Sequence, residues 1–243
     1  MANAQKTVTL FIQCLVDGIY PEVGAAMVVI FRKLGVNLTC PTQQTCCGQP
    51  AFNSGYHGEA RVAAKRFIKI FETAEVIVCP SGSCVTMVRH HYPQLFSNDA
   101  AWLQRAQDVA AKTFELTEYL VGSLGVDDLG AHYNGVITYH DSCHLLHNLR
   151  VKEQPRRLLR KISGTEFVEM HDSDRCCGFG GSFSFKYGDI STAMAEDKVN
   201  NIIASGADTL VGCDMGCLMN IQGMLSRKGS SIRAIHIAQL LAS

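Results

Sequence analysis

Short apolar runs alternate with amphipathic segments along the chain, and this alternation predicts strands that alternate with helices. Runs rich in Val, Ile and Thr predict strands near residues 8–12, 36–39, 76–78, 136–139, 166–170 and 209–211. Segments with helical periodicity, some opening near proline or ending at glycine, predict helices over 21–35, 58–71, 155–164 and 189–204. Because strand and helix alternate, the pattern indicates an α/β protein with mostly parallel sheets.

The cysteines occur in the same order twice. In each half a lone cysteine precedes a Cys-Cys-Gly triplet, and a further cysteine follows that triplet. The members are Cys14, Cys46, Cys47 and Cys84 in the first half, and Cys143, Cys176, Cys177 and Cys217 in the second. We therefore expect two tandem, pseudo-symmetric α/β units, residues 1–125 and 130–243, each a small, mostly parallel sheet with flanking helices. Residues 93–111 have no counterpart and are interpreted as a helical insertion in the first unit.

The composition of the chain indicates the compartment in which these cysteines lie. The 22 Lys and Arg residues balance 22 Asp and Glu residues, which argues against nucleic acid or an anionic membrane surface as partner. Residues 1–10 lack the features of an export signal, and the longest apolar stretch, residues 23–31, is too short to span a bilayer. We expect a cytoplasmic protein without a transmembrane segment, whose 11 cysteines remain thiols and can bind metal.

The positions of the repeated cysteines favour an iron–sulfur cluster in each half. Cysteines that follow strands of one parallel sheet meet at one edge of that sheet, and four thiolates are the common ligand set of a cluster. An adjacent pair can face one centre only if the backbone turns sharply, which Gly48 and Gly178 permit. Zinc is the alternative, but structural zinc sites usually contain Cys-x-x-Cys turns, which this sequence lacks.

The remaining cysteines and the histidines show weaker patterns. Cys40, Cys79 and Cys213 have no counterpart in the other half, so we interpret them as structural, although Cys79 and Cys213 could be additional or replacement ligands. The histidines of residues 139–147 and 90–91 could ligate metal, hydrogen-bond a cluster sulfur or move protons. Surface or capping roles are the simpler expectation for them.

Together these motifs resemble the cysteine-rich CCG-domain family of iron–sulfur oxidoreductase subunits, over almost the whole chain. The matching segments are residues 46–55, 80–84, 176–183 and 214–221. The resemblance is strongest to the lactate-utilization members of this family. It implies an oxidoreductase subunit with two four-iron clusters, which transfers electrons in a complex that oxidises L-lactate to pyruvate and supports growth on lactate.

The resemblance also implies partners. These are a ferredoxin-type iron–sulfur subunit and a third, smaller subunit, through which the chain could lie peripherally at the inner membrane and a quinone could accept electrons. No nucleic acid is implied. The sequence itself offers no flavin fingerprint, so the chain is expected to relay electrons and not to be active alone, and no catalytic residue is assigned.

Other functions stay open at this point. The heterodisulfide reductase branch of the family ends its motif in Cys-x-x-Cys, and both halves of this chain lack the first cysteine of that ending. A thiol/disulfide oxidoreductase like that branch, or an electron-transfer subunit for another 2-hydroxy acid such as glycolate, are the enzymatic alternatives. The non-enzymatic alternative is a zinc- or cluster-bearing sensor or interaction module, although the chain lacks the basic stripe of a DNA-reading domain.

Overall fold

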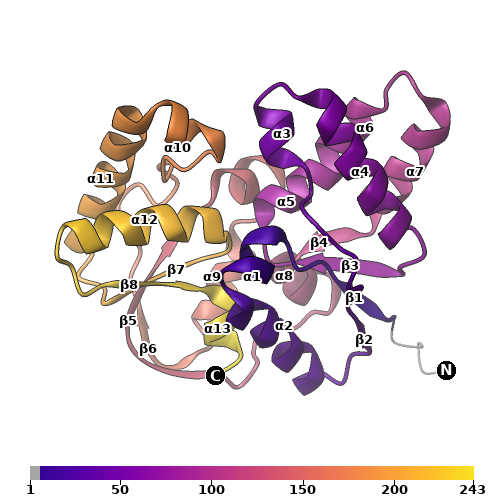
Figure 1. Ribbon diagram of the computed structural model, residues 1–243. Coiled ribbons are helices and arrows are strands. Elements are labelled where there is room, and N and C mark those ends of the chain that lie inside the picture. Colours follow the sequence, from indigo (N-terminus) through magenta and orange to yellow (C-terminus); the bar gives the residue numbers. More distant parts are fainter. Residues whose placement is uncertain (1–5) are drawn as a thin grey trace.

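Two four-stranded parallel sheets form the framework of the protein. The computed structural model describes residues 6–243, so the first residues of the predicted first unit, and half of the segment considered as an export signal, lie outside the described part. The strand orders are β2-β1-β3-β4 and β6-β5-β7-β8, and every pairing is parallel. The predicted fold class, two tandem α/β units, is confirmed (Figure 1). Within the described part, no helix combines the length and apolar character needed to cross a membrane.

The first sheet and its helices come from the first half of the chain. Their bounds are β1 (Val8–Leu10), α1 (Cys14–Gly18), α2 (Pro21–Lys33), β2 (Leu38–Thr39), α3 (Gln49–Asn53), α4 (His57–Phe71), β3 (Val76–Cys79), α5 (Gly82–Thr86), the π-helical turn η1 (Met87–His91), α6 (Tyr92–Leu95), α7 (Ala100–Ala111), β4 (Thr113–Glu115), α8 (Leu116–Glu118) and the π-helical turn η2 (Tyr119–Ser123). The predicted helices 21–35 and 58–71 agree with α2 and α4. Proline starts α2, and Asp99 caps α7, the main helix of the predicted insertion.

The second half repeats this order. Its elements are β5 (His132–His140), the π-helical turn η3 (His144–Asn148), α9 (Glu153–Leu159), β6 (Ser163–Phe167), α10 (Ser182–Lys186), α11 (Gly188–Ala204), β7 (Thr209–Gly212), α12 (Met215–Arg227), β8 (Arg233–His236) and α13 (Ile237–Leu241). The chain passes from α12 to β8 without a counterpart of α7. The helix predicted over 155–164 was too long: it ends at Leu159, because Ser163 to Phe167 pair with the long strand β5.

The two halves pack closely against each other. Helix α13 lies against α2 (Figure 1), and one hydrophobic core includes Val8 from the first sheet and Val211 from the second. At the start of α5, a Cβ atom added to Gly82 would lie 2.8 Å from the Cβ atom of Leu145 in η3. The absence of a side chain at Gly82 therefore allows the two halves to approach closely beside the carboxyl ends of their strands.

Candidate metal centre

The repeated cysteines lie where strands end. Cys14 begins α1 after β1, Cys84 lies in α5 after β3, and Cys143 and Cys217 take the same places after β5 and β7. Each Cys-Cys pair lies in the loop that follows the edge strand, β2 or β6. All eight of these cysteines line a single cavity of about 210 Å³ between the two halves. The sequence predicted two groups of four, and the structure brings both groups to one cavity.

In the first half the cysteine side chains lie close to one another. Cys47 Sγ lies 3.5 Å from Cys84 Sγ, and the thiols of Cys14 and Cys47 lie near enough to Cys46 to lower its pKa. The backbone N–H of Gly48 donates to Cys46 Sγ at 3.4 Å. Gly48 has a φ of +86°, which favours glycine, and so its loop turns sharply enough for both cysteines of the pair to face the cavity.

The second half has the same geometry. The thiols of Cys143 and Cys177 lie near enough to Cys176 to lower its pKa, and Cys217 lies near enough to Cys177 to raise the pKa of Cys177. The backbone N–H of Gly178 donates to Cys176 Sγ at 3.4 Å, as Gly48 does in the first half. Gly178 has a φ of +79°, and a Cβ atom there would lie 2.7 Å from a backbone oxygen of α11. The expectation that glycine allows each pair to turn is therefore confirmed by the backbone.

Each set of thiols shares its protons unevenly. Hydrogen bonds from Cys14 and Cys47 lower the pKa of Cys46 to about 3, and the same hydrogen bonds raise the pKa values of Cys14 and Cys47. In the second half, hydrogen bonds from Cys143 and Cys177 lower the pKa of Cys176 to about 2. In the first half, hydrogen bonds from Cys47 and Cys79 also lower the pKa of Cys84 to about 5. Each set thus contains at least one sulfur whose negative charge is stabilised by protons on neighbouring thiols. A cationic centre could replace those protons and bind all four sulfurs as thiolates.

The donor chemistry of each half fits an iron–sulfur cluster. Four thiols meet in each half, the usual number for such clusters, and a glycine N–H donates to one sulfur of each set. Hydrogen bonds to sulfur are among the means by which proteins tune these clusters. The cysteines of both repeats could therefore bind metal clusters.

His140, one of the histidines of residues 139–147, is a buried neighbour of the second set. The expectation of a surface or capping role is wrong for this residue, because it is 1% exposed and hydrogen-bonds no described residue through either ring nitrogen. Burial lowers its pKa to about 3, so the ring is neutral. A ring nitrogen of His140 and the sulfur atoms of Cys177 and Cys217 lie within 4.8 Å of one another. Its position at the end of a buried strand, three residues before Cys143, was the available signal.

The three unpaired cysteines lie outside the cavity. Cys40 is exposed and accepts a hydrogen bond from Gln44 at 3.3 Å. Cys79 and Cys213 are fully buried, and burial raises the pKa of each well above its usual value. The hydroxyl of Tyr139 donates to Cys213 Sγ at 3.2 Å. The burial of Cys79 and Cys213 agrees with a structural role for these two, and neither of them lines the cavity. Cys40 is exposed, so the expectation of a buried structural cysteine is wrong for this residue.

Polar contacts join the two halves at the cavity. Asp214 caps the start of α12, and one of its carboxylate oxygens accepts hydrogen bonds from Ser81 Oγ at 3.2 Å and from the N–H of Ser83 at 3.0 Å. His236 hydrogen-bonds the carbonyl oxygen of Pro80 at 3.1 Å. Ser81 and Asp214 are the N-caps of equivalent helices, so the helix starts that carry Cys84 and Cys217 are held together.

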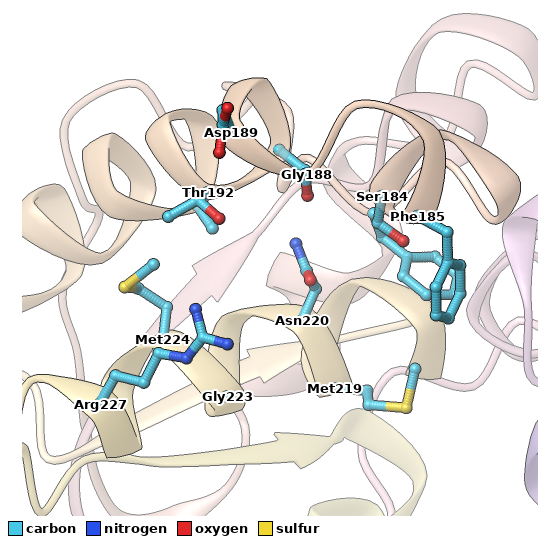
Figure 2. A pocket seen from close by; sticks show the side chains of 13 residues that line it. Ser184, Phe185, Gly188, Asp189, Thr192, Met219, Asn220, Gly223, Met224 and Arg227 are labelled. Carbon is cyan, nitrogen blue, oxygen red and sulfur yellow. The ribbon is translucent and has the colours of Figure 1, made fainter.

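A second cavity, of about 500 Å³, adjoins the cysteine cavity in the second half. Figure 2 shows Asp189 and Thr192 of α11 across from Met224 and Arg227 of α12, with Phe185 of α10 at one end. Phe179 lines both cavities. Because Phe179 is shared, this groove lies directly beside the second cysteine set.

Comparison with known proteins agrees with the repeat. The model of the cysteine-rich domain family CCG matches residues 8–89 and 137–222. Lactate utilization protein A of Macrococcus caseolyticus (strain JCSC5402) is 50% identical over 234 residues, which cover 96% of this chain and 95% of that protein. Lactate utilization protein A of Anoxybacillus flavithermus (strain DSM 21510 / WK1) is also 50% identical, over 96% of this chain and 98% of that protein.

A solved structure shares the fold. A hypothetical protein from Helicobacter pylori superposes with a TM-score of 0.66 at 14% identity, over 98% of this chain and 49% of that chain. This chain thus spans about half the length of that protein, and the likeness concerns the fold alone. The family matches confirm the resemblance seen in the sequence. With two CCG motifs on two equivalent sheets, the chain belongs to the cysteine-rich CCG-domain family, in the group of the lactate utilization A proteins.

Proposed function

We propose that this chain is the iron–sulfur electron-transfer subunit of a complex that oxidises L-lactate to pyruvate, and that it serves L-lactate degradation and growth on lactate. Relatives that are 50% identical over almost their full length are named for lactate utilization. The observation that carries the proposal is the cavity between the halves. All eight repeated cysteines line it, whereas Cys40, Cys79 and Cys213 do not.

The ligands of two four-iron clusters would be the two cysteine sets, one in each half. Bound clusters would supply one-electron transfer. The chain itself orients the sulfurs: Gly48 and Gly178 turn the two loops, and their N–H groups donate to Cys46 and Cys176. The sequence has no flavin fingerprint, and so we assign removal of hydride from lactate to a partner and electron relay to this chain.

We further infer the surroundings in which this relay works. It would act in the cytoplasm with a ferredoxin-type iron–sulfur subunit and a third, smaller subunit. A quinone reached through these partners would be the acceptor, and the partners would bring the complex to the inner membrane.

The first test is the metal content of protein purified without oxygen. Roughly eight irons per chain with matching sulfide, and an electron paramagnetic resonance signal after reduction, are expected for two four-iron clusters. Cys84→Ser and Cys217→Ser should each lose about half of the iron, whereas Cys213→Ser, the matched control outside the cavity, should keep all of it. Bound zinc without iron or sulfide, even after reconstitution, would leave a metal-stabilised interaction module instead.

The substrate is tested separately. The complex reconstituted with its partners should show cluster reduction by L-lactate, followed as bleaching of visible absorbance. Faster reduction by glycolate than by L-lactate would assign the chain to another 2-hydroxy acid.

A further inference from the structure

The two cysteine sites have the same architecture, so each position around the first site can be matched with an equivalent position around the second. A Cβ atom on Gly48 would lie 3.4 Å from the carbonyl oxygen of Ala60 in α4, and one on Gly178 would lie 2.7 Å from that of Ser191 in α11. Ala60 and Ser191 are therefore equivalent. Phe67 and Lys198 each lie seven residues, about two helical turns, further along these helices.

A second pair of positions matches in the same way. Phe11 lies three residues before Cys14, and His140 lies three residues before Cys143. In the first half the rings of Phe11 and Phe67 pack edge to face with centroids 4.8 Å apart. Both are buried in the same hydrophobic cluster as Cys47 and Cys84, so the wall of the first site is apolar at these two positions.

In the second half the same two positions hold a polar pair. Lys198 is fully buried, and its ammonium group donates to the carbonyl oxygens of Asp172 at 2.8 Å and Ser173 at 3.0 Å. Burial lowers the pKa of Lys198 to about 8, partly offset by nearby carboxylates and by the thiols of Cys177 and Cys217. The side chain is thus mostly positive at neutral pH, and its charge acts on two sulfurs of the second site.

Other charges near the second site do not cancel this difference. Asp141 accepts two hydrogen bonds from Arg156, at 2.9 and 2.7 Å, and the two buried charges offset each other. Arg156 also pairs with Glu169, whose side chain is 45% exposed. Asp214 acts on cysteines of both halves, Cys84 and Cys143, so it does not distinguish the two sites. Among the described residues, Lys198 is therefore the buried charge near the second site that no ion pair offsets, and the equivalent position of the first site holds Phe67.

We propose that the second cysteine site has the higher reduction potential of the two, because the buried ammonium of Lys198 stabilises the added electron there. The proposal rests on the proposed function, since it requires a cluster in each half. A reduced cluster is more negative than an oxidised one, and nearby positive charge favours it. In the transfer the first site loses the one electron that the second site gains, and no bond forms or breaks. An electron that enters this chain would therefore reduce the second site, beside Lys198, in preference to the first.

One feature of the first site acts in the opposite direction. Cys14 is exposed whereas Cys143 is only partly exposed, and water also stabilises the reduced state. This difference concerns one sulfur of four. Lys198 places a whole charge in a fully buried position, where screening by water is weak, so we expect the lysine to decide the order of potentials.

The test is a redox titration of the full-length protein loaded with iron and sulfide, followed by electron paramagnetic resonance. Lys198→Met should lower the higher of the two potentials by at least a tenfold change in the reduction equilibrium, about 59 mV, and leave the lower potential in place. Phe67→Met introduces the same side chain at the equivalent position of the first half and should leave the higher potential unchanged. Lys198→Arg, which keeps the positive charge, should also leave the higher potential unchanged.

A second neutral variant, Lys198→Gln, allows the same test if Lys198→Met does not fold. Lys198→Gln keeps a donor for the carbonyl oxygens of Asp172 and Ser173, and should lower the same potential. The inference is overturned if a fully loaded Lys198→Gln or Lys198→Met protein keeps both potentials, or if only the lower one moves. A wild-type protein that binds no iron and sulfide would overturn the proposed function itself.

Discussion

We expect Gly82→Ala to disturb the packing between the two halves, because the added methyl group would lie directly against Leu145 of the other half. In Gly82→Ala the new Cβ atom would lie 2.8 Å from Leu145 Cβ and 3.1 Å from both the Cα and the backbone nitrogen of Leu145. Real contacts of this kind are longer, and the neighbouring atoms are mostly backbone, so α5 and η3 must move apart. Such overpacking costs about 1–3 kcal/mol.

The expected loss is measurable by thermal unfolding of the metal-free, reduced protein. For a chain of this size each kcal/mol lowers the melting temperature by about 2–4 °C, so Gly82→Ala should melt about 2–12 °C lower than the parent. Because Cys84 and Cys143 flank this contact, the variant should also take up less iron during reconstitution.

Two further variants make the reasoning refutable. Gly223→Ala lies in the interior of α12 with nothing within 4 Å, and should stabilise the protein by about 0.5–1 kcal/mol through helix propensity. Adding Leu145→Ala to Gly82→Ala should not restore stability, because alanine keeps the three atoms that clash. An unchanged melting temperature in Gly82→Ala, or full rescue by Leu145→Ala, would refute the packing argument.

Three other changes have defined outcomes. Burial lowers the pKa of His236 to about 4, so the unfolded chain binds more protons in mild acid; from pH 6.5 towards 4, His236 by itself should lower the free energy of unfolding by about 1.4 kcal/mol per pH unit. His236→Gln should reduce this slope in denaturant titrations but not remove it, because burial lowers the pKa of His140 too; an unchanged slope would contradict the assignment. Arg156→Met leaves the carboxylate of Asp141 buried without its ion-pair partner and should cost about 3–5 kcal/mol, partly recovered by Asp141→Asn, and an equally stable single variant would count against it. Gly178→Ala strains a positive φ and forces a Cβ atom against a backbone oxygen of α11, so iron analysis should show loss from the second half only; normal iron content would be inconsistent with this loop geometry.

Much of the fold could be predicted from local patterns. Helices α2, α4 and α11 follow from helical periodicity with proline or glycine at their ends, and the repeated cysteine spacing predicts two equivalent units. The boundary between α9 and β6 was wrong because Gly164 resembled a helix stop, whereas it lies at a φ of +78° within the strand that pairs with β5. Pairing between distant segments decided that boundary.

The candidate site, like the fold, has some features that the sequence predicted and others that only the structure shows. The eight cysteines were identified from the sequence because spacing and the Cys-Cys-Gly triplets are local features; their role as metal ligands stays a prediction. The burial of His140 and Lys198 was not identified, since both are polar residues for which an exposed position is the ordinary expectation. Only the burial of His140 at the end of β5 and of Lys198 in α11 shows that they take the places of Phe11 and Phe67 of the first half.

The sequence by itself thus determined the α/β class, the duplication and the set of thiols, because hydrophobic periodicity and residue spacing are carried by short stretches of chain. The tertiary structure decided that both sets of thiols face one cavity, that Asp214 joins the two halves there, and that the two sites differ in buried charge. These features depend on which distant segments are brought together. They result from close packing between the halves and from the burial it imposes, which no local pattern specifies.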